Sequence, residues 1–320
     1  MKTVSVLIPT QNATPWLAEQ LTMLHSQTVP ISEIVIIDSE SEDNTCDIAA
    51  TDPLCRILSI RKTEFDHGGT RDFAARTCSS DYLWFLTQDA IPVDSHCLAE
   101  LLEAVDNADV ACAYARQMAS ASADKIERMN RQSNYPEQSF IRSAQDIPSL
   151  QIRAFFLSDT CCLYKRELYL SCGGFQHFLP SNEDMLMAAN FLRHGYSTAY
   201  CASACVWHTH HMSLAQWYGR SFDTGAFMKM FQRELQGVRA QSEGKKYAFS
   251  LMRQLIHDGQ IRLLFRFGMI CVMRMIGNYD GHRYTNFSLP SVLKRTQNPT
   301  FWQKYFDSDK SAAYTLDSPE

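Results

Sequence analysis

The chain has 320 residues, of which 45% are hydrophobic and 20% charged, a composition that argues for a soluble globular protein and excludes a largely disordered one. The length suits one large domain with an appendage, or two modest domains. The net charge of −5 is unevenly distributed: residues 229–310 hold 14 Lys and Arg against 6 Asp and Glu, whereas residues 1–228 hold 16 against 27. An acidic N-terminal part is therefore joined to a basic C-terminal part.

The eleven cysteines contain no CxxC pair, and their spacing does not suit a disulfide scaffold or a zinc ribbon. We interpret most of them as small buried hydrophobic residues in a reducing compartment. The N-terminal stretch "MKTVSVLIPT" has too short an apolar run and the wrong flanks for a signal peptide. We therefore expect a cytoplasmic protein.

Strands and helices alternate along the first 118 residues. Short apolar runs predict strands at 4–10, 32–41, 55–62, 82–90 and 109–118, and helices are predicted at 14–27, 42–52, 70–79 and 95–107. Thr14 is the expected N-cap of the first helix. This alternation predicts an α/β fold, Rossmann-like, with a mostly parallel sheet covered by helices on both faces.

Polar residues follow four of these strands at the points where each strand ends. They are Thr10 to Asn12, Asp38 to Ser41, Glu64 to Arg71, and Gln88 with Asp89. Ligands of parallel sheets bind beyond the carboxyl ends of the strands, so these loops are expected to form one polar ligand site. A nicotinamide-binding enzyme is disfavoured because no GxGxxG follows the first strand.

Six motifs in order resemble those of the family-2 inverting glycosyltransferases of the GT-A fold. They are "VSVLIPTQN", "EIVIIDSESEDNT", "GGTRDFAA", "WFLTQDAIP", "CGGF" and "NEDMLMAANFLRHGY", and the resemblance covers about residues 1–210. Within the family, "FDHGGTRD" and "LTQDA" look most like bacterial rhamnosyltransferases, which use dTDP-L-rhamnose. The resemblance implies a catalytic domain over 1–215, followed by a basic helical region over 216–320.

The implied reaction moves a sugar onto a bacterial surface polysaccharide or a lipid-linked oligosaccharide. L-rhamnose is the sugar that the resemblance favours. Nucleic acid is not an expected partner. Two alternatives stay open: a glycosyltransferase that uses a UDP-sugar, and a non-catalytic module that binds a nucleotide-sugar or a glycan.

For donor binding, the resemblance implies that Asp38 accepts the imide N–H of uracil or thymine. The further expected donor contacts are Pro9, Thr10, Asn12, Ser39, His67, Gly68, Arg71, Gln88 and Asp159. Gly68 and Gly69 permit close backbone approach to phosphate or sugar in a flexible loop over 64–72. The plainer alternatives are a turn or capping aspartate at position 38 and an internal Asp66–Arg71 ion pair in the loop.

A divalent cation, Mg²⁺ or Mn²⁺, is expected to bridge the protein and the donor pyrophosphate. The family's Asp-x-Asp reads Thr87, Gln88, Asp89 here, so only the second acid is present, and Asp89 is the expected metal ligand. His208, after the apolar "CASACVW", is the expected second ligand. Three histidines at 208, 210 and 211 suggest zinc at first sight, but no second ligand cluster has matching spacing. The alternatives are a turn aspartate and a structural histidine.

Inverting transfer needs one carboxylate beside the acceptor hydroxyl. Asp184 matches the family's general base, and Glu183 is expected to contact the acceptor or to support Asp184. Two acids at the start of a helix are also favoured by the helix dipole, which is the plainer alternative.

Two further segments have predicted roles. Residues 116–152 are expected to form a long mobile loop over the acceptor site. Residues 245–276 are expected to be helical, and Arg262, Arg266 and Arg274 interrupt any span long enough to cross a membrane. Their basic face suits peripheral contact with an anionic inner membrane surface. The alternative is a packed helical subdomain, with an oligomer interface possible.

Overall fold

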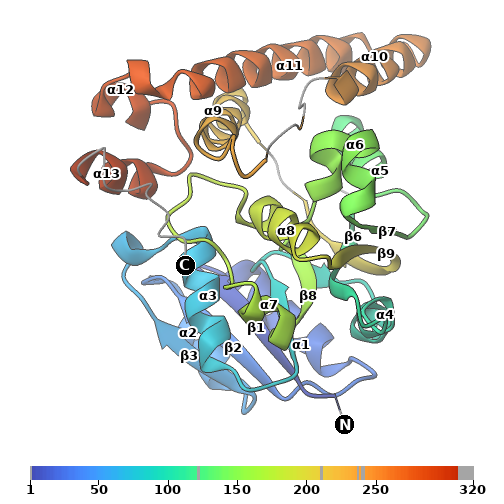
Figure 1. Cartoon of the computed structure of the whole chain (residues 1–320), viewed down its shortest axis with the longest axis vertical. Coiled ribbons are helices and arrows are strands. Elements are labelled where there is room, and N and C mark those ends of the chain that lie inside the picture. Colours follow the sequence, from blue (N-terminus) through green and yellow to red (C-terminus); the bar gives the residue numbers. More distant parts are fainter. Residues whose placement is uncertain (1, 121–122, 210–211, 236–237, 239–241, 309–320) are drawn as a thin grey trace.

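A computed structural model describes residues 2–120, 123–209, 212–235, 238 and 242–308. Its centre is a nine-stranded sheet in the order β3-β2-β1-β4-β8-β6-β9-β5, with β7 paired to β9 (Figure 1). The strands are β1 Val4–Thr10, β2 Glu33–Asp38, β3 Cys55–Ser59, β4 Tyr82–Leu86, β5 Ile91–Pro92, β6 Val110–Met118, β7 Phe140–Arg142, β8 Cys161–Lys165 and β9 Ser197–Trp207.

The strands β1, β2, β3 and β4 run parallel to one another, and β6 is parallel to β9. β8 runs antiparallel between β4 and β6, and β5 and β7 pair antiparallel with β9. The carboxyl ends of β1, β2, β3 and β4 therefore meet at one edge of the sheet. The α/β prediction is confirmed, and the sheet is mixed because of β8, β5 and β7.

Helices lie on both faces of the sheet. The α-helices are α1 Thr14–His25, α2 Thr45–Ala50, α3 His67–Thr77, α4 Cys97–Ala104, α5 Lys125–Asn134, α6 Ile147–Leu150, α7 Arg166–Ser171, α8 Glu183–Arg193, α9 Leu214–Met230, α10 Ser242–His257, α11 Ile261–His282, α12 Leu289–Leu293 and α13 Pro299–Asp307. One core packs α1, α2 and α4 against one face, and a second packs α3, α7 and α8 against the other. Both faces of the central strands are apolar, which explains their continuous hydrophobic runs.

The C-terminal helices α9 to α13 form a separate layer at the top of Figure 1. α9 and α11 approach each other closely, because a Cβ at Gly281 would lie 2.1 Å from the Phe222 carbonyl oxygen and one at Gly225 would lie 2.4 Å from that of Asn278. A small aromatic core around Phe222, Trp302 and Tyr305 joins α9 to α13. No helix in the described part of the chain is long and apolar enough to cross a membrane.

Three local predictions need correction. α1 is preceded by Ala13 as N-cap, and Thr14 is its first residue, with its backbone N–H donating to Asp43 Oδ2 at 3.1 Å. α3 begins at His67, three residues earlier than expected, because the Asp66 side chain accepts from the Gly69 N–H and caps the helix. The segment 64–72 is thus largely helical.

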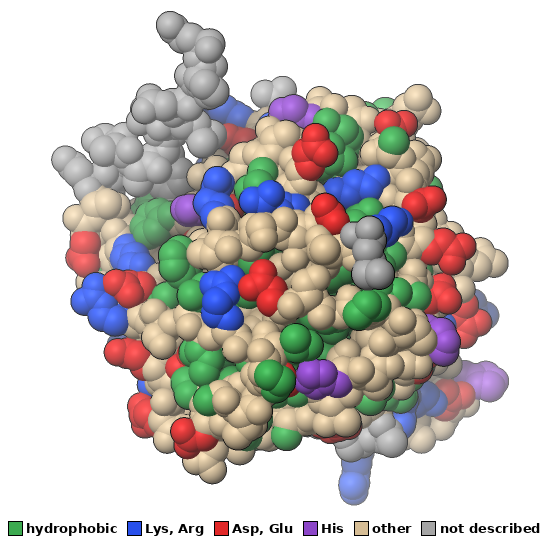
Figure 2. Space-filling view, turned by 90° about the horizontal axis from the view of Figure 1, so that it is seen from below, with side chains coloured by type: hydrophobic (Ala, Val, Ile, Leu, Met, Phe, Trp, Pro, Cys, Tyr) green, Lys and Arg blue, Asp and Glu red, His purple; other side chains and the backbone are tan. Residues whose placement is uncertain are grey.

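The third correction concerns residues 116–152, which are not one long loop. β6 runs to Met118, α5 follows, and β7 joins the sheet beside β9. Ile126 of α5 packs against Leu255 of α10 and Phe267 of α11. α5 therefore ties this segment to the C-terminal helices. On the face seen in Figure 2, acidic and basic side chains are scattered among one another.

Candidate active site

A cavity of about 330 Å³ lies at the carboxyl edge of the parallel strands. Its wall is formed by residues from the loops after β1, β2, β3 and β4, and from α13: Pro9, Thr10, Gln11, Ser39, Lys62, Phe65, His67, Arg71, Thr87, Gln88 and Thr300. Six of the ten predicted donor-binding residues lie on this wall. Asn12, Asp38, Gly68 and Asp159 do not, and their positions are described below.

Asp38 ends β2 and is buried beside Thr10, the last residue of β1. The Thr10 hydroxyl donates to Asp38 Oδ1 at 3.0 Å, and the Ser41 backbone N–H donates to Oδ2 at 2.9 Å. Asn12 adopts a positive φ of 53°, and its Oδ1 accepts from the Glu42 N–H at 2.9 Å. These contacts link the loops after β1 and β2. Asp38 therefore stabilises the turn that follows β2, and it also adjoins the cavity through its contact with Thr10.

The start of α3 packs directly against the loop that precedes α8. A Cβ at Gly68 would lie 2.3 Å from the Gln176 carbonyl oxygen, so only glycine fits there. Asp66 Oδ2 also accepts from the Phe178 N–H at 3.0 Å. Glycine at position 68 is therefore required by packing within the chain. From the sequence we expected this glycine to contact the donor and did not anticipate the packing role.

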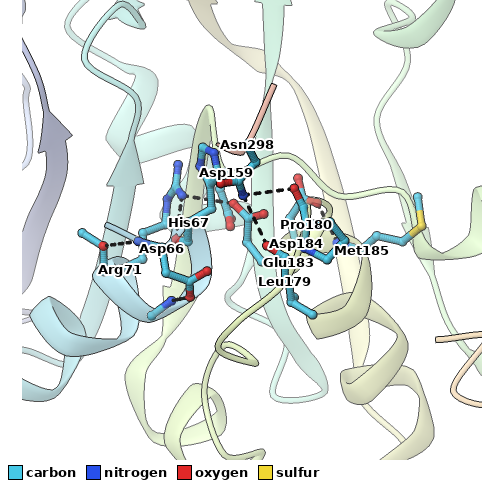
Figure 3. Close-up of polar contacts among 12 residues, drawn as sticks. Asp66, His67, Arg71, Asp159, Leu179, Pro180, Glu183, Asp184, Met185 and Asn298 are labelled. Carbon is cyan, nitrogen blue, oxygen red and sulfur yellow. Dashed lines mark hydrogen bonds and ion pairs between the residues drawn. The ribbon is translucent and has the colours of Figure 1, made fainter. Parts of the chain in front are cut away.

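Arg71, on α3, is buried and donates from Nη1 to Glu183 Oε1 at 3.0 Å. This pair replaces the Asp66–Arg71 pair considered from the sequence, because Asp66 caps α3 instead. Figure 3 shows Arg71, Asp159, Glu183 and Asp184 gathered between α3 and the start of α8. The Arg71 Nε has no hydrogen-bond partner.

The guanidinium of Arg71 is surrounded by three carboxylates, those of Asp159, Glu183 and Asp184. Burial, together with the charges of Glu183 and Asp159, raises the pKa of Asp184 well above its ordinary value. Burial also raises the pKa of Asp159 to about 7, against the opposing effect of Arg71. A raised pKa suits a carboxylate that must accept a proton near neutral pH.

Within this cluster, the two oxygens of Asp159 have different surroundings. The Tyr164 hydroxyl donates to Oδ1 at 2.6 Å, whereas Oδ2 is buried and has no hydrogen-bond partner among the described residues. Asp184 keeps partial exposure, and its Oδ1 accepts from the adjacent Met185 N–H at 2.7 Å. Both acids of α8 lie in its first turn, so the helix dipole and a chemical role are compatible.

Asp89 and His208 follow β4 and β9 and meet at the sheet edge. His208 Nε2 lies 3.4 Å from Asp89 Oδ2, and His208 Nδ1 lies 2.8 Å from Gln117 Oε1. Burial lowers the pKa of His208, which favours the neutral imidazole that a metal needs. His210 and His211 lie outside the described residues.

This pair fits a divalent cation that the donor phosphates help to hold. A carboxylate oxygen and an imidazole nitrogen are both ligands of Mn²⁺, and Mg²⁺ commonly takes one or two carboxylates with phosphate oxygens. The described residues contain no group of three or more His, Cys, Asp or Glu arranged around a metal. Gln88 does not join this pair, because its side chain bonds the backbone of Gln11.

Three residues of the C-terminal part, outside the predicted set, lie on or beside the site. Thr300 of α13 lines the cavity, and the Asn298 Nδ2 donates to the Leu179 and Pro180 carbonyls at 3.4 and 3.2 Å, just before α8. Burial lowers the pKa of both His67 and His208, and the charge of Arg220, on α9, adds to each shift. No sequence signal marked these residues, because they lie in the C-terminal part, beyond the quoted motifs.

Comparison with known proteins places the fold and the family. The family model described as glycosyl transferase family 2 matches residues 5–172. The chain is 36% identical to the O-antigen chain rhamnosyltransferase WbaN of Salmonella anatum, over 81% of this chain and 82% of WbaN. It is 34% identical to the O-antigen chain rhamnosyltransferase RfbN of Salmonella typhimurium, over 80% and 82% of the two chains.

Solved structures share the fold at low sequence identity. S. aureus TarS in complex with UDP-GlcNAc matches with a TM-score of 0.57 and 19% identity, over 80% of this chain and 73% of TarS. The mannosyltransferase PcManGT from Pyrobaculum calidifontis, in complex with GDP-Man and Mn²⁺, matches with a TM-score of 0.53 and 14% identity, over 96% and 88%. From its family model and its relatives, the chain belongs to glycosyltransferase family 2.

Proposed function

We propose that this glycosyltransferase moves L-rhamnose from dTDP-L-rhamnose onto the glycan of a bacterial surface polysaccharide, with inversion at the anomeric carbon. The observation that carries the proposal is the similarity to two O-antigen chain rhamnosyltransferases over about four fifths of each chain. The carboxylate cluster beside the cavity supports a catalytic role over a binding module.

The donor is proposed to lie along the cavity wall. The base of the donor is proposed to contact the loops after β1 and β2. Thr10 and Ser39 line the cavity there, and Asp38 accepts a hydrogen bond from Thr10. Ser39 Oγ is buried without a partner, which leaves it available to a ligand. Its diphosphate meets cationic side chains near the same wall, namely Lys62, Arg71 and Arg220.

Asp89 and His208 are proposed to hold the divalent cation together with the donor phosphates. When bound, the cation supplies positive charge that stabilises the leaving diphosphate. The Gln117 side chain contacts His208 Nδ1 and would fix the orientation of the imidazole ring.

Asp184 is proposed as the general base. The acceptor hydroxyl oxygen attacks the anomeric carbon, its proton passes to the Asp184 carboxylate, and the bond from the anomeric carbon to the diphosphate oxygen breaks on the opposite face. Glu183 is held by Arg71 and lies next to Asp184 at the start of α8. Asp159, with its unpartnered Oδ2, is proposed to contact a sugar hydroxyl.

A donor screen tests the proposal. The purified chain is incubated with dTDP-L-rhamnose, UDP-GlcNAc or GDP-mannose, each with Mg²⁺ or Mn²⁺, and release of the nucleoside diphosphate is measured. We expect the fastest release from dTDP-L-rhamnose. Faster release from UDP-GlcNAc or GDP-mannose would contradict the donor assignment, and release from none, with no thermal stabilisation by any donor, would contradict catalysis.

A further inference from the structure

α11 carries a row of exposed apolar side chains along its outer side. This apolar stripe consists of Ile261, Phe265, Val272, Met275, Ile276 and Tyr279. Phe265 is 73% exposed and Met275 is 68% exposed, values far from those of core residues. The positions recur at the helical period, so the side chains gather on one face of the helix.

The opposite side of α11 is the one that packs within the protein. Phe267 and Ile270 are buried against α5 and α10, and Gly277 and Gly281 lie against the backbone of α9. Figure 1 shows α11 along the edge of the molecule farthest from the β1–β3 end of the sheet. The apolar stripe is therefore a second apolar face, which the folding of this layer does not require.

Basic residues lie along the stripe, and the neighbouring acids are paired. Arg262 and Arg283 are exposed on α11 and just after it, and Arg266 pairs with Asp124 of α5. On the adjoining α10–α11 turn, Asp258 pairs with Lys125 at 2.5 Å. The surface around the stripe thus carries net positive charge.

We propose that the apolar stripe is a membrane-contact surface, on which α11 lies in the headgroup layer of a bilayer that contains anionic lipids. An exposed apolar face bordered by arginines matches the requirements of an interfacial helix, which buries its apolar face and places its cations among lipid phosphates. With 22 residues, α11 is about 33 Å long and lies in the plane of the membrane.

A second copy of the chain suits the stripe less well. Antiparallel packing of two α11 helices would bring Arg262 of one copy toward Arg283 of the other. Like charges at a contact oppose association, whereas an anionic bilayer complements them. The surface is independent of the donor proposed above.

This proposal changes the residues expected from the sequence. Arg274 stacks over the Trp217 ring at 5.5 Å, and Arg266 is engaged by Asp124, so these two arginines have partners within the protein. Phe265 and Met275 carry the contact instead, with the exposed Arg262 beside them.

Co-sedimentation of the full chain with vesicles tests the proposal. The vesicles contain phosphatidylglycerol in phosphatidylcholine, and pure phosphatidylcholine is the comparison. We expect binding to the anionic vesicles and about ten-fold weaker binding for Phe265→Ser with Met275→Ser. Arg262→Gln should weaken binding by about five-fold at low salt, and by less at high salt, where charges are screened.

Ile141→Ser is the matched control, because Ile141 is also exposed but lies on β7. It should bind as the wild type does. Thermal unfolding of each variant verifies the fold, and Ile261→Ser with Tyr279→Ser serves as a second stripe variant. Equal binding of wild type and both stripe variants overturns the proposal. A wild type that self-associates without lipid, and becomes monomeric in the stripe variants, also overturns it and assigns the stripe to a second copy.

Discussion

At the carboxyl edge of the sheet, three carboxylates share one buried guanidinium, whereas in the C-terminal helices a single buried carboxylate accepts three hydrogen bonds. That carboxylate is Asp223 of α9, which accepts from the Thr296 hydroxyl at 2.6 Å, the Gln297 N–H at 2.8 Å and the Trp302 Nε1 at 2.9 Å. At the sheet edge, by contrast, Asp159 Oδ2 and Arg71 Nε are buried without partners.

This difference distinguishes a buried carboxylate that stabilises the fold from buried carboxylates that serve the candidate site. Buried polar atoms without partners cost stability, and a ligand that meets them offsets that cost. Asp223 joins α9 to the segment before α13. This segment leads to Asn298, which contacts the loop before α8, and to Thr300 on the cavity wall. The C-terminal region thereby stabilises the geometry of a site whose own charges are incompletely compensated.

The largest expected effect follows from removing the proposed base. Asp184→Asn keeps an oxygen for the Met185 N–H but cannot accept a proton, so turnover of the donor onto an acceptor should fall by about 10²–10⁴-fold. Donor affinity should stay within about three-fold, since Asp184 is not on the cavity wall.

Glu19→Gln, an exposed change on α1, is the matched control and should leave turnover unaltered. Turnover and donor affinity are measured separately, by product release and by calorimetry. An Asp184→Asn enzyme with more than a third of wild-type turnover would rule out Asp184 as the base.

A smaller effect is expected from removal of the cation. With Mg²⁺ or Mn²⁺, dTDP-L-rhamnose at about 100-fold above its dissociation constant should stabilise the protein by about 2.7 kcal/mol. EDTA should remove most of this gain in a thermal-shift assay, and so should His208→Ala, because the imidazole of His208 is one of two proposed protein ligands. Asp94→Asn, an exposed carboxylate after β5, is the control. A thermal shift that EDTA leaves unchanged contradicts the metal role of Asp89 and His208.

Breaking the contact between Asn298 and the loop before α8 should have a moderate effect on catalysis. Asn298→Asp keeps Oδ1, which accepts from the Phe301 N–H and caps α13, but loses the N–H groups that donate to the Leu179 and Pro180 carbonyls. The start of α8 should shift slightly, and kcat should fall by about ten-fold while the donor KM changes little. A drop in thermal stability with unchanged kcat would assign Asn298 to folding alone.

The smallest expected effect is a shift of the pH profile. The charge of Asp159 raises the pKa of Asp184, so Asp159→Asn should lower that pKa. Because the base must be deprotonated, activity rises with pH through the pKa of Asp184, and the acid limb of the kcat profile should move to lower pH. A limb that stays in place, or moves to higher pH, would show that the two carboxylates do not interact as described.

Much of the fold could be predicted because strand and helix periodicity is local. The strands β1 to β4 and β6 lie close to their predicted positions, α8 begins at its two acids as expected, and the loops expected to converge do so. Glu183 and Asp159 were expected as separate contacts, but their grouping around Arg71 depends on the packing of α3 against α8, which joins residues 112 positions apart. Thr300 reaches the cavity because α13 packs back against the catalytic part of the chain. No local sequence pattern indicates this tertiary contact.

The early start of α3 and the ordered α5 were missed for different reasons. The two glycines at 68 and 69 disfavour a helix by intrinsic propensity, but the Asp66 cap and the contact with Gln176 outweigh this cost. The polar composition of α5 suggested a loop, yet the helix is held by the single buried Ile126 and by its contact with α10 and α11.

The contrast between the two buried carboxylates is tested most directly by the free energy of unfolding of Asp184→Ala and Asp223→Ala, measured in parallel by denaturant titration. Burial raises the pKa of Asp223 as well, to about 6, but the hydrogen bonds from Thr296, Trp302 and Gln297 oppose that shift. Asp223→Ala should therefore lose about 1–3 kcal/mol, because these buried donors lose their acceptor. Asp184→Ala should be more stable than the wild type at neutral pH. A carboxyl whose folded pKa is raised stabilises the fold at low pH and loses that contribution as the pH rises through the raised pKa, so the gain should shrink toward acid pH. Opposite signs at neutral pH support the account, and a loss of stability in both variants would contradict it.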